Sequence, residues 1–270
     1  MDIFYFGRLN YIGERSLLDL LQSGYKYRSD HNTKYGIFDV ETIEDSDLGK
    51  IYTGELVKYN DVKSEDVIKD DQISKENIFD AIKGTSRFYL TETDHIIAYN
   101  PYGRILSDRS FRKAFSGVII AGDDSFIVDS VIFPVNIEHQ FRELFENMKL
   151  LSKLTFNLTP SNPNNRDVWK KIDEKLGKMR VKKYKEEFLA KEGESIELDE
   201  ESKAKMVMAE DGYGKVIGQG KDQDDNDVVI STDKKENILK GRIEKELSVK
   251  NQIESLKRIY KNIRERFNKN

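Results

Sequence analysis

The segment 118–163 constrains the fold most, because the spacing of its apolar residues changes from strand-like to helical and back. Residues 118–121 and 130–134 are apolar and rich in β-branched side chains, and a proline ends the second run, which favours two strands. Residues 141–148 place apolar side chains at helical spacing, which predicts a short amphipathic helix. Residues 154–159 alternate apolar and polar side chains, as in a half-buried strand. Strand, helix and strand together predict a βαβ unit.

The N-terminal segment 1–116 reads as a series of strands. Two pairs of strand-like runs, one within 35–59 and one within 86–99, are each joined by a polar turn, which predicts two hairpins. The run 61–75 is almost entirely charged, which favours a solvated loop or an exposed helix. We therefore expect a strand-rich antiparallel domain over residues 1–116.

Helices and strands alternate after residue 116. The order of elements over 117–234 predicts an α+β domain with a ferredoxin-like arrangement. Residues 235–270 lack proline and predict one basic amphipathic helix with a heptad seam. The seam consists of Val249, Ile253, Leu256, Tyr260 and Ile263. The expected fold class is α+β, with a strand-rich antiparallel N-terminal half, a ferredoxin-like βαβ C-terminal half and a long C-terminal helix.

The composition excludes several classes of protein. The 270 residues include no cysteine, which excludes disulfides, thiolate zinc sites and a cysteine nucleophile. Charged residues make up 35% of the chain, yet 10% aromatic residues argue against disorder. No apolar run reaches the ~20 residues that a membrane helix needs, and the N-terminus lacks the pattern of a signal peptide. We expect a cytoplasmic protein, and the Lys-, Ile- and Asn-rich composition is typical of a low-GC bacterium or its phage.

Two local patterns approach known ligand loops but differ in spacing. The glycine-rich run 212–221 lacks the glycine and hydroxyl positions of a phosphate-binding loop. The acidic run 222–227 lacks the glycine of a calcium loop. The three histidines are scattered, at His31, His95 and His139. We therefore expect no cofactor and no metal site built on histidine.

Acidic residues beside strand ends give one catalytic hypothesis. Two neighbouring strands bring Asp39 and Glu55 together in the predicted hairpin, with Lys58 nearby. Carboxylates can hold divalent cations for phosphodiester cleavage, and a lysine can stabilise the attacking or leaving group. A metal-dependent nuclease or toxin is therefore the alternative function.

Basic residues near the C-terminus give a nucleic-acid hypothesis. The candidates for phosphate contact are Lys182, Lys183, Lys185, Lys257, Arg258, Lys261 and Arg264. Lysine and arginine clusters bind phosphates, and nearby tyrosines can stack on bases. The simpler interpretation is that the helical seam packs on the body of the protein or on a twin helix, which would give a homodimer with solvated lysines.

Several short motifs, taken in order, resemble one protein family. These are Tyr35-Gly36, the run 52–59, the run 154–163, the run 211–214 and the strand 228–232. The chain is similar over about residues 30–235 to a bacterial family of unknown function met in mobile-element and phage-defence gene neighbourhoods. The resemblance implies a cytoplasmic component of an antiviral assembly rather than a metabolic enzyme, and it carries no catalytic residues.

The leading functional hypothesis is therefore a component of bacterial phage defence. It would act by protein–protein contact, by nucleic-acid binding through the C-terminal region, or by both. The expected partners are another protein subunit, a second copy of the chain through the helical seam, or DNA or RNA.

Overall fold

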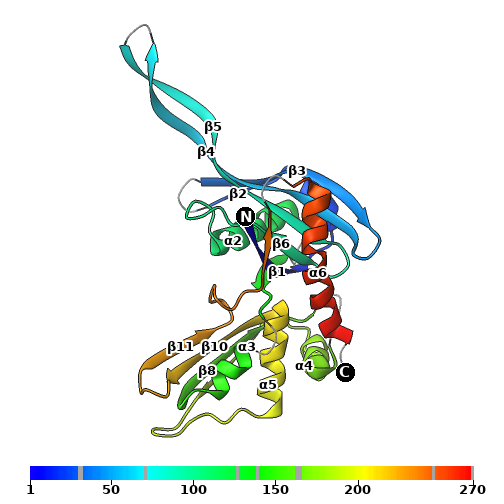
Figure 1. Cartoon of the computed structure of the whole chain (residues 1–270), viewed down its shortest axis with the longest axis vertical. Coiled ribbons are helices and arrows are strands. Elements are labelled where there is room, and N and C mark those ends of the chain that lie inside the picture. Colours follow the sequence, from blue (N-terminus) through cyan, green and yellow to red (C-terminus); the bar gives the residue numbers. More distant parts are fainter. Residues whose placement is uncertain are drawn as a thin grey trace.

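The computed structural model describes residues 1–29, 33–69, 72–125, 128–137, 140–161, 166–244 and 247–268. The elements within these ranges form two units, each built on its own antiparallel sheet (Figure 1). His31 and His139 lie outside the described residues, so the structure tests only one of the three histidines considered above.

The large sheet holds eight strands in the described part of the chain, in the order β12, β1, β6, β5, β4, β3 and β2, with β7 also paired to β1. The strands are β1 (Asp2–Ile12), β2 (Lys26–Arg28), β3 (Thr33–Asp45), β4 (Gly49–Lys69), β5 (Gln72–Thr91), β6 (Ile96–Tyr99), β7 (Asp129–Pro134) and β12 (Lys240–Ile243). The two predicted hairpins are confirmed as β3–β4 and β5–β6. The first and last strands of the chain, β1 and β12, are neighbours.

Side chains alternate between the two faces of the sheet along each strand, so both faces carry apolar side chains to be covered. Helices cover both faces of the large sheet. The helices are α1 (Leu17–Gln22), α2 (Asp108–Gly122) and α6 (Val249–Asn268). On one face, Phe111 of α2 stacks on Tyr99 with 4.2 Å between ring centroids. On the opposite face, Tyr260 of α6 meets Phe6 edge-on at 5.2 Å. The central strands are therefore buried on both sides.

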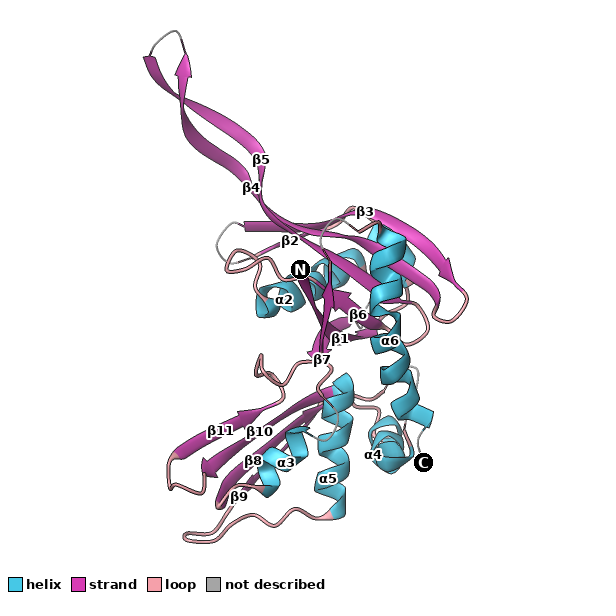
Figure 2. Ribbon diagram, viewed as in Figure 1, coloured by secondary structure: helices cyan, strands magenta, loops and turns pink. Residues whose placement is uncertain are grey.

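The small sheet has the order β11, β10, β8 and β9. Its strands are β8 (Leu150–Leu158), β9 (Tyr184–Leu189), β10 (Gly214–Lys221) and β11 (Asp227–Ser231), and its helices are α3 (Gln140–Glu146), α4 (Asp167–Lys178) and α5 (Glu200–Met208), followed by a π-helical turn η1 (Ala209–Tyr213). The helices share one core with the apolar positions of β8 (Figure 2). Trp169 of α4 is fully buried there.

The ferredoxin-like prediction is wrong for this sheet. In a split βαβ unit the strands on either side of the helix run parallel, with another strand between them. Here β8 and β9 flank α4 and are direct antiparallel neighbours. The strand predicted at 130–134 exists as β7, but it pairs with β1 and so belongs to the large sheet. The coarser prediction, a mixed fold with antiparallel sheets and a C-terminal helix, is confirmed.

Other boundaries also differ from the predictions. Residues 118–121, expected as a strand, continue α2, whose buried face includes Val118 and Ile119. Helix α2 therefore runs across the boundary expected at 116/117. The terminal helix begins at Val249 rather than near 235, because residues 240–243 form the edge strand β12. No helix in the described ranges is long and apolar enough to cross a membrane.

Serine side chains cap two helices of the large unit. Ser16 accepts a hydrogen bond from the backbone N–H of Asp19 and begins α1. Ser107 accepts one from Ser110 and begins α2. Such caps satisfy backbone donors that the first turn of a helix leaves without partners. They fix where α2 begins, and α2 carries part of the groove described below.

Candidate binding surfaces

A long two-stranded arm projects from the large sheet (Figure 1). The ladder between β3 and β4 ends at Asn60, and from there β4 pairs only with β5 among the described residues. We call residues 61–80 the β4–β5 arm. At a rise of about 3.3 Å per residue, its strands reach roughly 30 Å beyond the sheet. The prediction of a loop or exposed helix over 61–75 is therefore wrong for the described part of that run.

The sequence of the arm is acidic. Its carboxylates are Asp61, Glu65, Asp66, Asp70, Asp71, Glu76 and Asp80, and its cations are Lys63, Lys69 and Lys75. Ile73 near the tip is 78% exposed, and Ile82 at the root is 68% exposed. The arm thus combines a negative sequence with exposed apolar side chains and two strand edges that pair with no third strand in the described chain.

The residues of the nuclease hypothesis lie at the root of this arm. Asp39 and Glu55 line one cavity of about 410 Å³, next to Phe38 and Lys26. Lys58 does not line it, because its ammonium donates to the carbonyl of Ile105 at 2.9 Å. The structure therefore brings together two of the three predicted residues.

Two charged side chains of this cavity already have partners. Glu55 pairs with Arg87 at 2.8 Å. The Lys26 ammonium lies 3.8 Å from the centre of the Phe38 ring, and burial lowers its pKa. Within the described residues no group of three or more histidines and carboxylates is placed to hold a metal ion. Two-metal chemistry requires such clustered ligands, so the nuclease hypothesis gains no support from this geometry.

The basic residues predicted to bind nucleic acid fall on separate elements, and most have acidic partners. Lys182 and Lys183 both contact Asp129, at 3.6 and 3.2 Å. On α6, Lys257 pairs with Asp45 and Lys261 pairs with Asp47, at the turn between β3 and β4. Arg264 pairs with Asp94, in the turn between β5 and β6. Lys185 and Arg258 remain exposed. The set therefore does not form one open basic surface.

The seam expected to form a homodimer is buried within the chain itself. Ile253, Leu256, Tyr260 and Ile263 are each at most 3% exposed, and Val249 packs against the same core. The Tyr260 hydroxyl donates to the carbonyl of Tyr89 at 2.7 Å. The seam packs on the large sheet and is not available to a twin helix, which corrects the predicted dimer contact.

Buried charges join the two units, and the sequence analysis did not identify them. Arg8 of β1 donates to the carbonyl of Asp211 in η1 at 2.8 Å, and Trp169 donates to its carboxylate at 3.0 Å. Arg266 of α6 donates to the carbonyl of Asn136 at 3.0 Å. The neighbouring Glu210 is 2% exposed, and burial raises the pKa of this carboxyl to about 7. We call these residues the joint.

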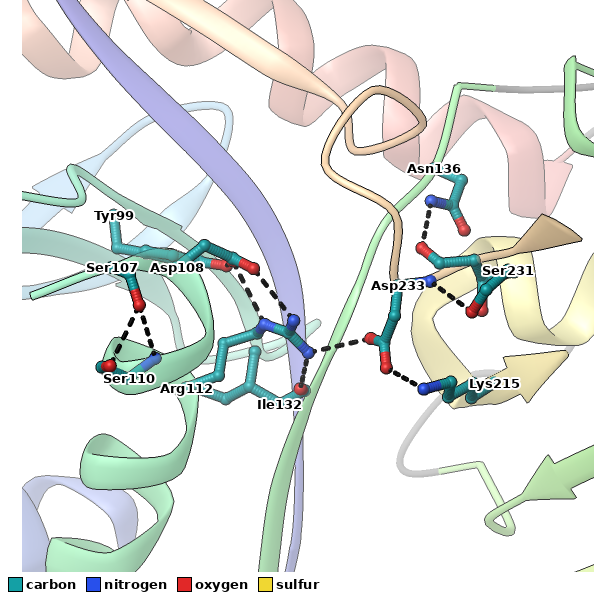
Figure 3. Close-up of polar contacts among 11 residues, drawn as sticks. Tyr99, Ser107, Asp108, Ser110, Arg112, Ile132, Asn136, Lys215, Ser231 and Asp233 are labelled. Atoms are coloured by element: carbon teal, nitrogen blue, oxygen red, sulfur yellow. Dashed lines mark hydrogen bonds and ion pairs between the residues drawn. The ribbon is translucent and has the colours of Figure 1, made fainter. Parts of the chain in front are cut away.

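A second connection between the units runs through Arg112 of α2 (Figure 3). Its guanidinium donates to Asp108 at 2.9 Å and to Asp233 at 3.1 Å, and Asp233 in turn pairs with Lys215 of β10 at 2.5 Å. Burial opposes the charge on Arg112, yet the adjacent tyrosine and carboxylates raise its pKa overall. This chain of charges holds α2 against the small sheet.

Arg112 also lies in the wall of a groove between α2 and β7. We call it the α2–β7 groove, a cavity of about 450 Å³ whose lining includes Tyr27, Arg109, Lys113, Ser116, Ser130 and Asp233. The groove was not predicted, because its walls come from segments that no local motif connects. Its cations belong to α2, a helix that begins within the segment expected to be strand-rich.

The comparisons with known proteins give a family and no activity. No curated protein matches the sequence. A family model described as a domain of unknown function, DUF4747, matches residues 15–261, which include the small sheet, the large sheet apart from β1, the arm and most of α6. Because this match covers most of the chain, the protein belongs to the DUF4747 family, a family of unknown function.

Proposed function

We propose that this chain is a protein-binding component that engages its partner through the β4–β5 arm. The observation that carries the proposal is the arm itself, which extends beyond every other strand of the large sheet (Figure 2). A two-stranded hairpin without further strands or a covering helix is only marginally stable in water. An arm of this length is therefore stabilised by a bound partner, and binding that partner is its function.

The strand edges of the arm favour a protein partner. Within the described residues, β4 from Val62 to Lys69 hydrogen-bonds to β5 and to no third strand, so the outer edges of the arm offer backbone groups to which another strand can be added. Such edges accept an added strand from another protein, and exposed side chains such as Ile73 then supply specificity.

The charge of the arm sets the chemistry of that partner. Seven carboxylates stand against three lysines over residues 61–80. Negative charge opposes contact with phosphates, whose binding depends on lysine and arginine. We therefore propose a partner protein with a basic surface, and charge complementarity would speed its association with the arm.

The resemblance noted in the sequence supports a setting for this contact. The family it suggests occurs in phage-defence gene neighbourhoods, so we propose that the partner is a component of the same bacterial antiviral system in the cytoplasm. Deleting the arm would then abolish protection in a phage-plating assay without lowering the amount of folded protein. Full protection by the arm-deleted chain would contradict this setting.

The arm contact is tested by site-specific photocrosslinking in cells. Ile73 is replaced by the photoreactive amino acid p-benzoylphenylalanine, and Leu189 on β9, which is 70% exposed, serves as the matched control. We expect one basic protein to crosslink at position 73 and not at position 189. Equal crosslinking at both positions, or crosslinking at 73 to nucleic acid, would overturn the proposal.

A shortened arm gives the second measurement. Asn60 and Ala81 are cross-strand partners, so an Asn-Gly turn can replace residues 61–80 without changing the register of the body. The partner protein that crosslinking identifies is purified by itself and titrated with the full chain and with the shortened chain by calorimetry. We expect binding to the full chain only, and equal affinity for the two chains would refute the role of the arm.

A further inference from the structure

We infer that the α2–β7 groove binds a small phosphorylated ligand, of the size and chemistry of a nucleoside monophosphate. The groove lies where α2 faces β7, and Figure 3 shows Arg112 of α2 and Ile132 of β7, which both belong to its lining. Its volume of about 450 Å³ falls in the range of small-molecule sites. Four features of its lining specify the ligand.

The first feature is charge. The lining contains the cations Arg109, Arg112 and Lys113 and the single carboxylate Asp233, although the whole chain carries a net charge of −4. Arg112 and Asp233 pair with each other at 3.1 Å. No ion pair is recorded for Arg109 or Lys113 among the described residues, and both are exposed. The groove therefore keeps two cations for an anion.

The second feature is the spacing of these cations. Arg109 and Lys113 are four residues apart on α2, so they lie on the same side of the helix. Like charges at this spacing destabilise a helix. An anion bound between them removes that repulsion and accepts hydrogen bonds from both side chains.

The third feature is a pair of buried hydroxyls. Ser116 on α2 is 7% exposed and Ser130 on β7 is 5% exposed, and both line the groove. Neither hydroxyl has a hydrogen-bond partner within the described structure. A buried polar group without a partner is costly and rare in native proteins, and a missing ion or water is a common explanation. Phosphate oxygens are acceptors that both hydroxyls can use.

The fourth feature is an apolar wall beside the cations. The ring of Tyr27 lies directly on Gly117, where an added Cβ would come within 2.6 Å of it. Ile120 continues this wall and is 36% exposed. A wall of aromatic and aliphatic side chains next to cations fits a nucleobase joined to a phosphate better than it fits free phosphate.

The inference is tested by isothermal titration calorimetry of the full chain with AMP, adenosine and inorganic phosphate. We expect AMP to bind, inorganic phosphate to bind more weakly and adenosine not to bind at millimolar concentration. The test is repeated with GMP, CMP and UMP, since the wall does not select a base. Absence of heat from all four nucleotides, or equal affinity for adenosine and AMP, would overturn the inference.

Variants locate the binding. The double variant Arg109→Ala/Lys113→Ala should lower the AMP affinity at least tenfold. Lys250→Ala/Arg258→Ala removes the same charge from the exposed side of α6 and should leave the affinity unchanged. Circular dichroism and the melting temperature confirm that both variants are folded. An equal loss of affinity in the two variants would show attraction to net charge and would refute a site in the groove.

Ser116→Ala separates a ligand contact from a structural role. The Ser116 hydroxyl has no hydrogen bond to lose in the described structure, so its removal should leave the melting temperature unchanged or slightly higher. The AMP affinity should nevertheless fall about tenfold, the size expected for a hydrogen bond to a charged acceptor. Unchanged affinity for AMP would overturn the placement of the phosphate at this hydroxyl.

Discussion

The β4–β5 arm and helix α6 are both rich in charged residues, mostly acidic in the arm and mostly basic in the helix, and they have opposite places in the fold. The cations of α6 pair with Asp45, Asp47 and Asp94, and the apolar side of the helix is buried on the large sheet. Beyond Asn60 the arm pairs only with itself in the described chain. Charge density alone therefore does not distinguish a structural element from a binding element. The distinction depends on whether the rest of the fold supplies opposite charges for the charged side chains of the element and an apolar surface on which the element packs.

The largest effect that sharpens this contrast is a core substitution in α6. Leu256 is fully buried, and Leu256→Ala should lower the free energy of unfolding by about 3 kcal/mol, because it removes apolar contacts and leaves a cavity. Ile73→Ala in the exposed part of the arm should change it by less than about 0.5 kcal/mol. Urea denaturation measures both. Similar values for the two variants would erase the difference between helix and arm.

The joint at the end of α6 should make stability depend on pH. The pKa of Glu210 is raised to about 7 by burial and by Asp211, against the opposing charge of Arg266. The folded state therefore binds this proton more tightly than the unfolded state, so the stability contribution is complete at low pH and is lost as pH rises towards 7. Relative to Glu210→Gln, the wild type should lose about 2 kcal/mol between pH 5 and pH 8.

Urea denaturation of both proteins across this pH range isolates the effect of Glu210, because their other titratable groups are the same. A constant difference in free energy between wild type and Glu210→Gln at every pH would mean that Glu210 titrates at its ordinary pKa. The joint would then be open to water rather than sealed by α6.

Arg264 tests the charged side of α6. Its guanidinium pairs with Asp94 and donates to the carbonyls of Asp47 and Leu48, both at 2.8 Å. Arg264→Ala should therefore cost about 1.5 kcal/mol, since charged hydrogen bonds are lost and carbonyls are left without donors. Arg258→Ala, on the exposed side of the same helix, should cost less than about 0.5 kcal/mol. Equal values would make the contacts of Arg264 energetically unimportant.

The smallest expected effect comes from removing the arm. Replacing residues 61–80 by an Asn-Gly turn should shift the melting temperature by less than about 2 °C, because a lone hairpin contributes little to stability. Differential scanning calorimetry measures the shift. A fall of more than about 5 °C would mean that the arm stabilises the body, and the contrast with α6 would fail.

The sequence allowed a local element to be predicted where the regular spacing of apolar residues, or a polar turn between two strands, determined it. The hairpins and the apolar seam of α6 both follow from spacing between close neighbours. The arm was misjudged because its charges obscured the signal of Val62, Val67, Ile68, Ile73 and Ile78, β-branched residues that favour strands. A search for such residues within charged runs would have found it.

The joint and the groove depend on contacts between distant parts of the chain. Arg8 and Asp211 are separated by 203 positions, and Arg112 and Asp233 by 121. An arginine that will be buried looks the same in the sequence as one that will be solvated. Its partner becomes visible only after β1, α2 and η1 have been brought together.

The pairing of β1 with β12 has a consequence for how the protein is made. Asp2 to Tyr5 hydrogen-bond to Lys240 to Ile243, so the large sheet cannot be completed until residues 240–243 have left the ribosome. At a synthesis rate of roughly 5–20 residues per second, this wait is on the order of tens of seconds. The apolar side chains of β1 that α6 will cover stay exposed for that time. Nascent chains should therefore depend on a chaperone at the ribosome, and premature stops near the C-terminus should yield insoluble protein.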